Sequence, residues 1–132
     1  MKTILVVEDE LAISMVLGAY LEKDGYEVQY AYDGMEALQK VDEVKPSLIL
    51  LDVMMPKLDG WSVLKEIREK SSCPVIMLTA LSDTNEKLQG FDGGADDYIT
   101  KPFVAEEVLA RVSAVLRRSP QLEDADKVKL YG

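Results

Sequence analysis

Histidine is absent from this chain of 132 residues, and cysteine occurs only once, as Cys73. A single cysteine excludes an internal disulfide and a cysteine-based metal cluster. The absence of histidine removes the commonest metal ligand and the side chain that most often acts as an acid or base near neutral pH. Zinc chemistry and catalysis by a Ser–His or Cys–His pair are therefore not expected.

Long apolar runs are also absent. No run of apolar residues approaches the roughly 20 residues that a membrane-spanning helix requires. The amino-terminal sequence MKTILVVEDE reaches carboxylates before a signal-like apolar segment could form. We therefore expect a cytoplasmic protein that makes no contact with a membrane.

Positive charge is scarce, since 15 lysine and arginine residues face 24 aspartate and glutamate residues and leave a net charge of -9. Proteins hold phosphate backbones with clustered lysine and arginine, so this segment is not expected to bind nucleic acid itself. Most of the acidic residues are expected to form solvated surface. The length fits one compact domain whose core needs neither disulfides nor a structural metal.

Short apolar runs alternate with longer stretches of helical period, an alternation typical of βαβ units and a parallel sheet. Three of the runs are nearly continuous aliphatics, as in sheets whose two faces are both covered by helices. Strands are predicted at residues 3–7, 27–31, 47–51, 74–78 and 97–100. Helices are predicted within 13–21, 34–41, 63–67, 85–91 and 104–116. The sequence therefore predicts an α/β fold with a single five-stranded parallel sheet flanked by five helices.

Chemically distinctive residues follow four of the predicted strands, at the point where each strand ends. They are Glu8, Asp9 and Glu10 after the first strand, Asp52 after the third, Thr79 and Ala80 after the fourth, and Lys101, Pro102 and Phe103 after the fifth. The carboxyl ends of parallel strands meet at one edge of a sheet, where the functional groups of open α/β sheets gather. We therefore expect all of these residues to meet at that edge.

This set of side chains suits a divalent cation and a phosphoryl group. Crowded carboxylates repel one another, and a hard cation such as Mg²⁺ (or Mn²⁺) relieves the repulsion. Lys101 offers a compact positive charge to a phosphoryl oxygen, while the Thr79 hydroxyl and the Ala80 amide offer hydrogen-bond donors. A carboxylate such as Asp52 can attack phosphorus without a general base, because it is already ionised at neutral pH. We therefore hypothesise that Asp52 is a nucleophile that forms an acyl phosphate.

Each of these residues also has an ordinary structural interpretation. Asp52 could be a helix N-cap or a turn residue, and the acidic residues 8–10 could form a solvated loop that leads into a helix. Thr79 could be a strand-end hydroxyl, and Lys101 could belong to a simple turn. These interpretations do not predict that such residues follow four separate strands, so their joint appearance favours the phosphoryl site.

Four segments, in this order and spacing, resemble the receiver domain of bacterial two-component response regulators: VVEDE, LILLDVMMPKLDGW, VIMLTA and GADDYITKPF. The resemblance extends from residue 3 to about residue 119. It implies the strand order 2-1-3-4-5 and a phosphorylation-activated signalling switch rather than a conventional turnover enzyme. By this resemblance Asp52 would be the phosphoacceptor, and a sensor histidine kinase would be the donor in a Mg²⁺-dependent reaction.

The resemblance also implies a ligand set for the metal. Asp9, Asp52 and the backbone carbonyl of Met54 would hold Mg²⁺. Glu8 would help directly or through a water molecule.

The same resemblance implies which groups contact phosphate and which respond to it. Thr79, the Ala80 amide and Lys101 would contact the phosphoryl group, and the peptide bond between Lys101 and Pro102 would be cis, since an X-Pro bond is where the cis form costs least. Thr79 would move toward the phosphate and the Tyr98 ring would turn inward behind it. The alternative for Tyr98 is a half-buried aromatic residue on an edge strand.

Charges of both signs on the fourth helix, fifth strand and fifth helix resemble the dimer face of the OmpR/PhoB subfamily. Its pairs would include Lys87 with Glu107 and Asp97 with Arg111. The alternative is an ordinary solvated surface. The residues assigned to this face are Lys87, Asp96, Asp97, Glu107, Arg111 and Arg118.

Residues 1–119 are expected to form the receiver domain, and residues 120–132 a linker. The segments GADDYITKPF and VKLYG resemble the same subfamily, whose members continue into a winged-helix DNA-binding domain, and the chain stops where that domain would begin. Phosphorylation would then promote homodimerisation, and DNA would be bound only through that further domain. The alternative is a stand-alone receiver that acts through protein contacts.

Two other functions use a similar fold. A phosphatase of the haloacid-dehalogenase type would need a second aspartate two residues after the nucleophile, where Met54 stands. An FMN-binding module of the flavodoxin type would need a loop rich in serine and threonine after the first strand, where EDELA stands. Both are therefore less favoured than the receiver.

Overall fold

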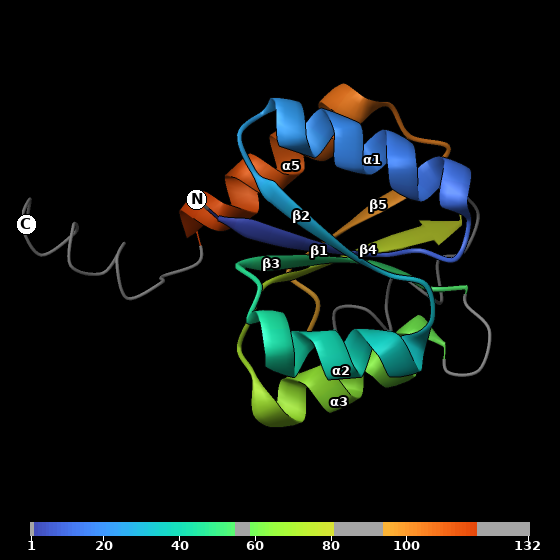
Figure 1. Cartoon of the computed structure of the whole chain (residues 1–132), viewed down its shortest axis with the longest axis vertical. Coiled ribbons are helices and arrows are strands. Elements are labelled where there is room, and N and C mark those ends of the chain that lie inside the picture. Colours follow the sequence, from blue (N-terminus) through green and yellow to red (C-terminus); the bar gives the residue numbers. More distant parts are fainter. Residues whose placement is uncertain (1, 55–58, 81–93, 119–132) are drawn as a thin grey trace, which may run out of the picture.

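The structure is a computed structural model that describes residues 2–54, 59–80 and 94–118. Within these residues strands and helices alternate from the amino terminus as far as the fourth strand (Figure 1). The strands are β1 (Thr3–Val7), β2 (Glu27–Ala31), β3 (Leu48–Asp52), β4 (Val75–Ala80) and β5 (Asp97–Lys101). The helices are α1 (Leu11–Lys23), α2 (Gly34–Val44), α3 (Gly60–Lys70) and α5 (Ala105–Arg118).

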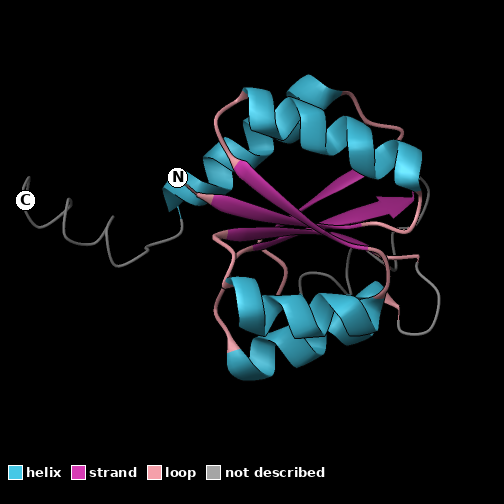
Figure 2. Ribbon diagram, viewed as in Figure 1, coloured by secondary structure: helices cyan, strands magenta, loops and turns pink. Residues whose placement is uncertain are grey.

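The five strands form one sheet in the order β2-β1-β3-β4-β5, and all neighbours are parallel. This confirms the predicted sheet and its strand order. Helices α1 and α5 cover one face, and α2 and α3 cover the other (Figures 1 and 2). The helix predicted at residues 85–91 lies outside the described residues, whereas the other four predicted helices are present.

Three strands, β3, β4 and β5, end later than the sequence predicted. Strand β3 includes Asp52, which pairs with Leu78, and the amide of Val53 still donates to the carbonyl oxygen of Leu78 at 3.0 Å. The ladder between β4 and β5 continues to the pair Ala80 and Lys101. Ladder hydrogen bonds use the main chain alone, so a polar side chain at a strand end does not stop the pairing. Asp52, Thr79, Ala80 and Lys101 therefore lie inside the ends of their strands rather than just after them.

Apolar side chains form a separate core on each face of the sheet. Successive residues of a strand point to opposite faces, so Leu50 packs into the core beneath α1 and α5 while Leu51 packs into the core beneath α2 and α3. All four apolar residues of β3 are fully buried. Burial on both faces explains why these strands are continuous aliphatic runs, and it makes the sheet a rigid support for its carboxyl edge.

Local capping fixes where the helices beside that edge begin. The Asp33 carboxylate accepts a hydrogen bond from the Glu36 amide at 2.8 Å, and the Glu36 carboxylate accepts one from the Tyr32 amide at 2.7 Å. The pair resembles a capping box, except that Glu36 accepts from the residue before the N-cap Asp33 rather than from the N-cap itself. Asp59 caps α3 in a similar way, by accepting a hydrogen bond from the Ser62 amide at 3.0 Å.

No helix in the part of the chain that the structure describes is both long and apolar enough to span a membrane.

Candidate functional site

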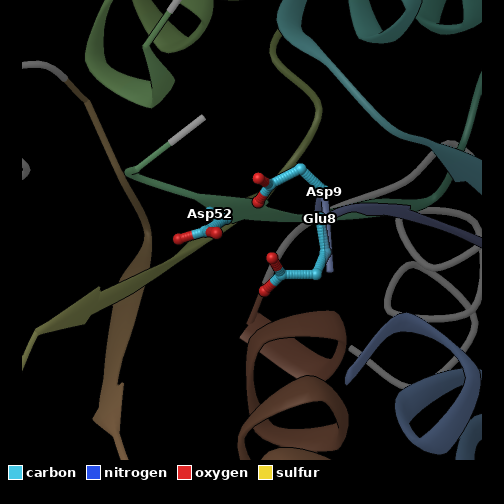
Figure 3. A group of neighbouring side chains, drawn as sticks. All are labelled: Glu8, Asp9 and Asp52. Carbon is cyan, nitrogen blue, oxygen red and sulfur yellow. The ribbon is translucent and has the colours of Figure 1, made fainter. Parts of the chain in front are cut away.

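Three carboxylates converge at the carboxyl edge of the sheet. Glu8 and Asp9 directly follow β1, Asp52 ends the neighbouring strand β3, and Figure 3 shows the three side chains gathered around one point. Each offers an oxygen atom, and these atoms all lie within 4.8 Å of one another. Glu8 is 0% exposed and Asp52 is 2% exposed, whereas Asp9 lies at the surface. The site is therefore a buried acidic pocket with an exposed carboxylate at its mouth.

Lys101 brings one positive charge to this pocket from β5. Its Nζ lies 3.2 Å from Oε1 of Glu8 and 3.2 Å from Oδ1 of Asp52. Burial alone would lower the pKa of Lys101, but the charges of Asp52 and Glu8 outweigh burial and raise that pKa above its ordinary value. Lys101 is therefore a cation at neutral pH, and it offsets only part of the negative charge.

Burial and the excess negative charge together change the pKa of Glu8. Burial raises the pKa of Glu8 from 4.5 to about 8, and a hydrogen bond to Asp52 and repulsion by its charge act in the same direction. The Glu10 amide, which donates to Oε2 of Glu8 at 3.2 Å, and the charge of Lys101 act against the shift. Near neutral pH the pocket therefore retains a proton on Glu8.

The donor set fits a hard divalent cation. All three side chains are carboxylates, two of them are buried, and the pocket holds a proton that a cation could replace. Mg²⁺ prefers one or two carboxylates together with water and phosphate oxygens, at a site that remains partly open. Glu8, Asp9 and Asp52 are the side chains that could hold such an ion.

Main-chain groups orient the acidic side chains. The amide of Met54 donates to Oδ1 of Asp52 at 3.2 Å, so the chain turns back over the carboxylate directly after β3. The side chain of Met54 is 69% exposed, while its backbone amide contacts the Asp52 carboxylate. The Met54 carbonyl, assigned to the metal by the resemblance, belongs to this turn.

Thr79 and Ala80 lie on β4, beside the strand that carries Asp52. Because Asp52 pairs with Leu78, Thr79 is the next residue toward the carboxyl edge, and its side chain is buried. Ala80 pairs with Lys101 at the end of β5. The register therefore gathers the four predicted strand-end residues at one edge.

Pro102 directly follows Lys101, and Tyr98 lies three residues before it on the same strand. The peptide bond between Lys101 and Pro102 is cis, the isomer that the resemblance implied. Tyr98 is half-buried on β5 and packs against the core beneath α2 and α3. Its place on the outermost strand of the sheet suits both interpretations made from the sequence.

The charges predicted to form a dimer face make contacts within one chain. Nη1 of Arg111 lies 3.1 Å from Oδ2 of Asp97, and Nε of Arg111 lies 3.3 Å from Oε2 of Glu107. Asp97 and Arg111 are thus already paired inside the molecule. Arg118 is an exposed residue at the end of α5, and Lys87 lies outside the described residues.

Asp96 makes a different contact from the other members of that set. Its Oδ2 accepts hydrogen bonds from Nη2 of Arg68 and from the Val75 amide, both at 2.9 Å. Asp96 therefore joins α3 to the amino ends of β4 and β5. The sequence analysis assigned no role to Arg68, because its partner lies 28 residues further along the chain.

Gly60 is a second residue whose place the sequence analysis missed. It is buried at the start of α3, and its amide donates to the carbonyl oxygen of Val53 at 2.9 Å. The signal available in the sequence was a glycine directly after the N-cap residue Asp59, at the end of the loop that follows Asp52. That pattern marks a helix start but not a contact with the site.

An apolar hollow of about 580 Å³ lies beside Lys101. Residues of α1 and of the chain after β5 line it: Ala12, Ile13, Val16, Lys101, Pro102 and Phe103. The same two segments carry exposed apolar side chains, among them Leu11, Met15 and Val104. The acidic pocket therefore adjoins apolar surface.

A comparison with protein families matches residues 4–113 to the response regulator receiver domain. Over 130 residues the chain is 47% identical to the DNA-binding dual master transcriptional regulator RpaA of Synechocystis sp., a match that covers 96% of this chain and 54% of that protein. Over 129 residues it is 50% identical to the alkaline phosphatase synthesis transcriptional regulatory protein PhoP of Bacillus subtilis, covering 97% of this chain and 54% of that one. The chain spans about half the length of these curated relatives.

Solved structures give the same family. The receiver domain of Francisella response regulator 1452 superimposes with a TM-score of 0.85 at 37% identity, covering 91% of this chain and 100% of that one. A two-component response regulator from Clostridium difficile superimposes with a TM-score of 0.86 at 32% identity, covering 89% of this chain and 98% of that one.

Proposed function

Since the chain belongs to the response regulator receiver family, and is therefore not a conventional enzyme, we propose that it is a signalling switch in which Asp52 accepts a phosphoryl group from a sensor histidine kinase. One observation carries the proposal: Glu8, Asp9, Asp52 and Lys101 come together at the carboxyl edge from three different strands. Neither a helix cap nor a simple turn requires this convergence.

Glu8, Asp9 and Asp52, with the backbone carbonyl of Met54, would hold Mg²⁺ (or Mn²⁺) in this function. When bound, the ion supplies positive charge that offsets the charge developing on the transferred group. The carboxylates of this chain supply its ligands, and the Met54 amide keeps the Asp52 side chain oriented through its hydrogen bond to Oδ1.

Asp52 supplies the nucleophile. Its carboxylate oxygen forms a bond to phosphorus as the bond between phosphorus and the donor nitrogen breaks, and the product is an acyl phosphate. Lys101 lies 3.2 Å from Asp52 and provides a compact positive charge to an oxygen of the incoming group. The Thr79 hydroxyl and the Ala80 amide, at the same end of the sheet, would donate hydrogen bonds to the remaining phosphoryl oxygens.

The surroundings of the pocket support a protein as the donor. The hollow beside Lys101 is lined mainly by apolar side chains, and Leu11, Met15 and Val104 are each at least 60% exposed on the segments that border it. Exposed apolar surface of this kind marks sites of protein association. A cytoplasmic kinase domain that presents a phosphohistidine would meet apolar surface beside an acidic pocket.

The output proposed for the switch lies on the β5 and α5 side of the molecule. Thr79 and Tyr98 would transmit phosphorylation toward this surface, which carries Asp97, Glu107 and Arg111. Exposed ion pairs contribute only about 0–1 kcal/mol each, so exchange of partners between Arg111 and a second chain would set the register of a dimer rather than its affinity.

A transcriptional role rests on the relatives' names and on their length. Relatives named as transcriptional regulators are about twice as long as the matched segment. We therefore propose that residues 1–119 act as the receiver, that 120–132 act as a linker, and that a DNA-binding domain follows in the natural protein.

Intact-protein mass spectrometry tests the central step. After incubation with acetyl phosphate and Mg²⁺, the parent chain should gain the mass of one phosphoryl group, and Asp52→Asn should gain none. Asp24→Asn is a matched control, because it makes the same chemical change at an exposed residue in the turn between α1 and β2. Equal phosphorylation of the parent and Asp52→Asn would refute the assignment.

A further inference from the structure

Helix α3 begins directly against the main chain that carries Asp52. The Gly60 amide donates to the carbonyl oxygen of Val53 at 2.9 Å, and Gly60 is buried. The Val53 amide in turn donates to Leu78 on β4. The backbone of Val53, directly after β3, is therefore hydrogen-bonded both to the first residue of α3 and to β4.

No side chain fits at Gly60. A Cβ atom there would lie 2.8 Å from the Cα of Val53 and 3.0 Å from the carbonyl carbon of Asp52, and it would lie closer still to the carbonyl oxygen of Asp52. These are main-chain atoms, which cannot rotate away as the end of a side chain can. Gly60 is not among the glycines with a positive φ, so its conformation would admit an L-residue and only the lack of space excludes one.

The helix is poorly able to yield to such a contact. Three of its side chains, Val63, Leu64 and Ile67, are fully buried in the core beneath α2 and α3. The N-cap hydrogen bond from Ser62 to Asp59 fixes its first turn. A group added at Gly60 would therefore displace the strand end as well as the helix.

We infer that Gly60 is a positioning residue of the phosphoryl site, because the absence of a side chain there sets the path of the backbone through Asp52, Val53 and Met54. This inference rests on the function proposed above. The displaced segment would include the Asp52 carboxylate, the Met54 amide that orients it, and the Met54 carbonyl proposed as a metal ligand. Gly60 itself touches neither metal nor phosphate.

The variant Gly60→Ala tests the inference through Mg²⁺ affinity, measured by isothermal titration calorimetry. We expect the Kd for Mg²⁺ to rise about tenfold or more, and phosphorylation by acetyl phosphate to slow with it, since misplacement of binding groups by up to 1 Å can cost about 100-fold. Ile67→Val and Ile67→Ala are the controls, because they destabilise the same helix from its buried face. Both should leave the Kd within about twofold of the parent value. Equal Mg²⁺ affinities for Gly60→Ala and an Ile67 variant of the same stability would overturn the inference.

A measurement on the unaltered chain covers the case in which Gly60→Ala does not fold. Mg²⁺ should slow hydrogen exchange of the Gly60 amide, while exchange at Ser71, whose amide donates to Ile67 at 2.8 Å at the far end of the same helix, should stay unchanged. If the chain binds Mg²⁺ and both amides respond alike, the inference is wrong. If the parent chain neither binds Mg²⁺ nor accepts a phosphoryl group, the proposed function itself fails.

Discussion

The two edges of the sheet hold charged clusters that differ in charge balance. At the amino edge, Arg68 donates to Asp96 and to the carbonyl oxygens of Cys73 and Gly94, so a single guanidinium serves one carboxylate and two neutral acceptors. At the carboxyl edge, the described residues place one ammonium, that of Lys101, in a cluster with three carboxylates, two of which it contacts. The first cluster is complete within the chain, whereas the second leaves negative charge for a ligand to offset.

This difference separates structural charge from functional charge. A cluster whose charges and hydrogen bonds are satisfied can serve stability alone, and the Arg68 contacts join α3 to the segments that lead into β4 and β5. A buried cluster with surplus charge costs free energy unless something binds there or a group takes up a proton. In the ion-free chain, the proton held by Glu8 offsets part of this surplus negative charge.

Lys101→Met should have the largest effect on function. We expect the rate of phosphorylation by acetyl phosphate to fall about 100-fold, because a lost charge-stabilising donor typically costs 100- to 1000-fold. Mg²⁺ affinity should not weaken, since the variant removes positive charge from beside the carboxylates. Lys70→Met, which breaks an exposed pair with Asp42 on the α2 and α3 side, is the matched control. A phosphorylation rate equal to that of Lys70→Met would contradict the role given to Lys101.

Arg68→Met should instead lower stability and spare phosphorylation. Loss of the charged hydrogen bonds to Asp96 and to two carbonyl oxygens should reduce the free energy of unfolding by about 2 kcal/mol. Urea denaturation measures the loss, and Lys70→Met should stay within about 0.5 kcal/mol of the parent. A phosphorylation rate that fell as far as in Lys101→Met would erase the distinction between the two edges.

A smaller effect is expected on the pH dependence of stability, and it comes from Glu8 at the carboxyl edge. The pKa of Glu8 is raised from 4.5 to about 8 on folding, so between these values the folded chain binds more protons than the unfolded chain. The free energy of unfolding of the ion-free chain should therefore fall as pH rises from 5 to 8, by about 1 kcal/mol or more.

Glu8→Gln isolates this contribution, because the amide keeps the size of the side chain and cannot ionise. Urea denaturation at pH 5 and pH 8 without divalent cations should show a weaker fall in stability for the variant than for the parent. An identical fall in both chains would show that Glu8 does not hold the proton.

Much of the fold could be predicted from the sequence because both faces of the sheet are buried. The runs around Leu5, Leu50 and Ile76 are continuous aliphatics for that reason, and helical periods separate them. The exact strand ends were less predictable. Asp52 and Lys101 extend their strands because main-chain pairing is indifferent to the charge of a terminal side chain.

The candidate site, like the fold, could be predicted only in part. Parallel strands bring their carboxyl ends together, so the meeting of Asp9, Asp52 and Lys101 could be expected from order in the sequence alone. The proton on Glu8 depends on burial by other segments, and the close approach of Gly60 to Asp52 depends on how α3 packs. Neither property is encoded in a local pattern.

Locating the modified residue tests the central claim most directly. Borohydride reduces an acyl phosphate to an alcohol, which would convert phosphorylated aspartate into homoserine. After reaction with acetyl phosphate and Mg²⁺, reduction and peptide mapping by tandem mass spectrometry, we predict homoserine at position 52. Reduction at Glu8 or Asp9 instead, with Asp52 unchanged, would contradict the account.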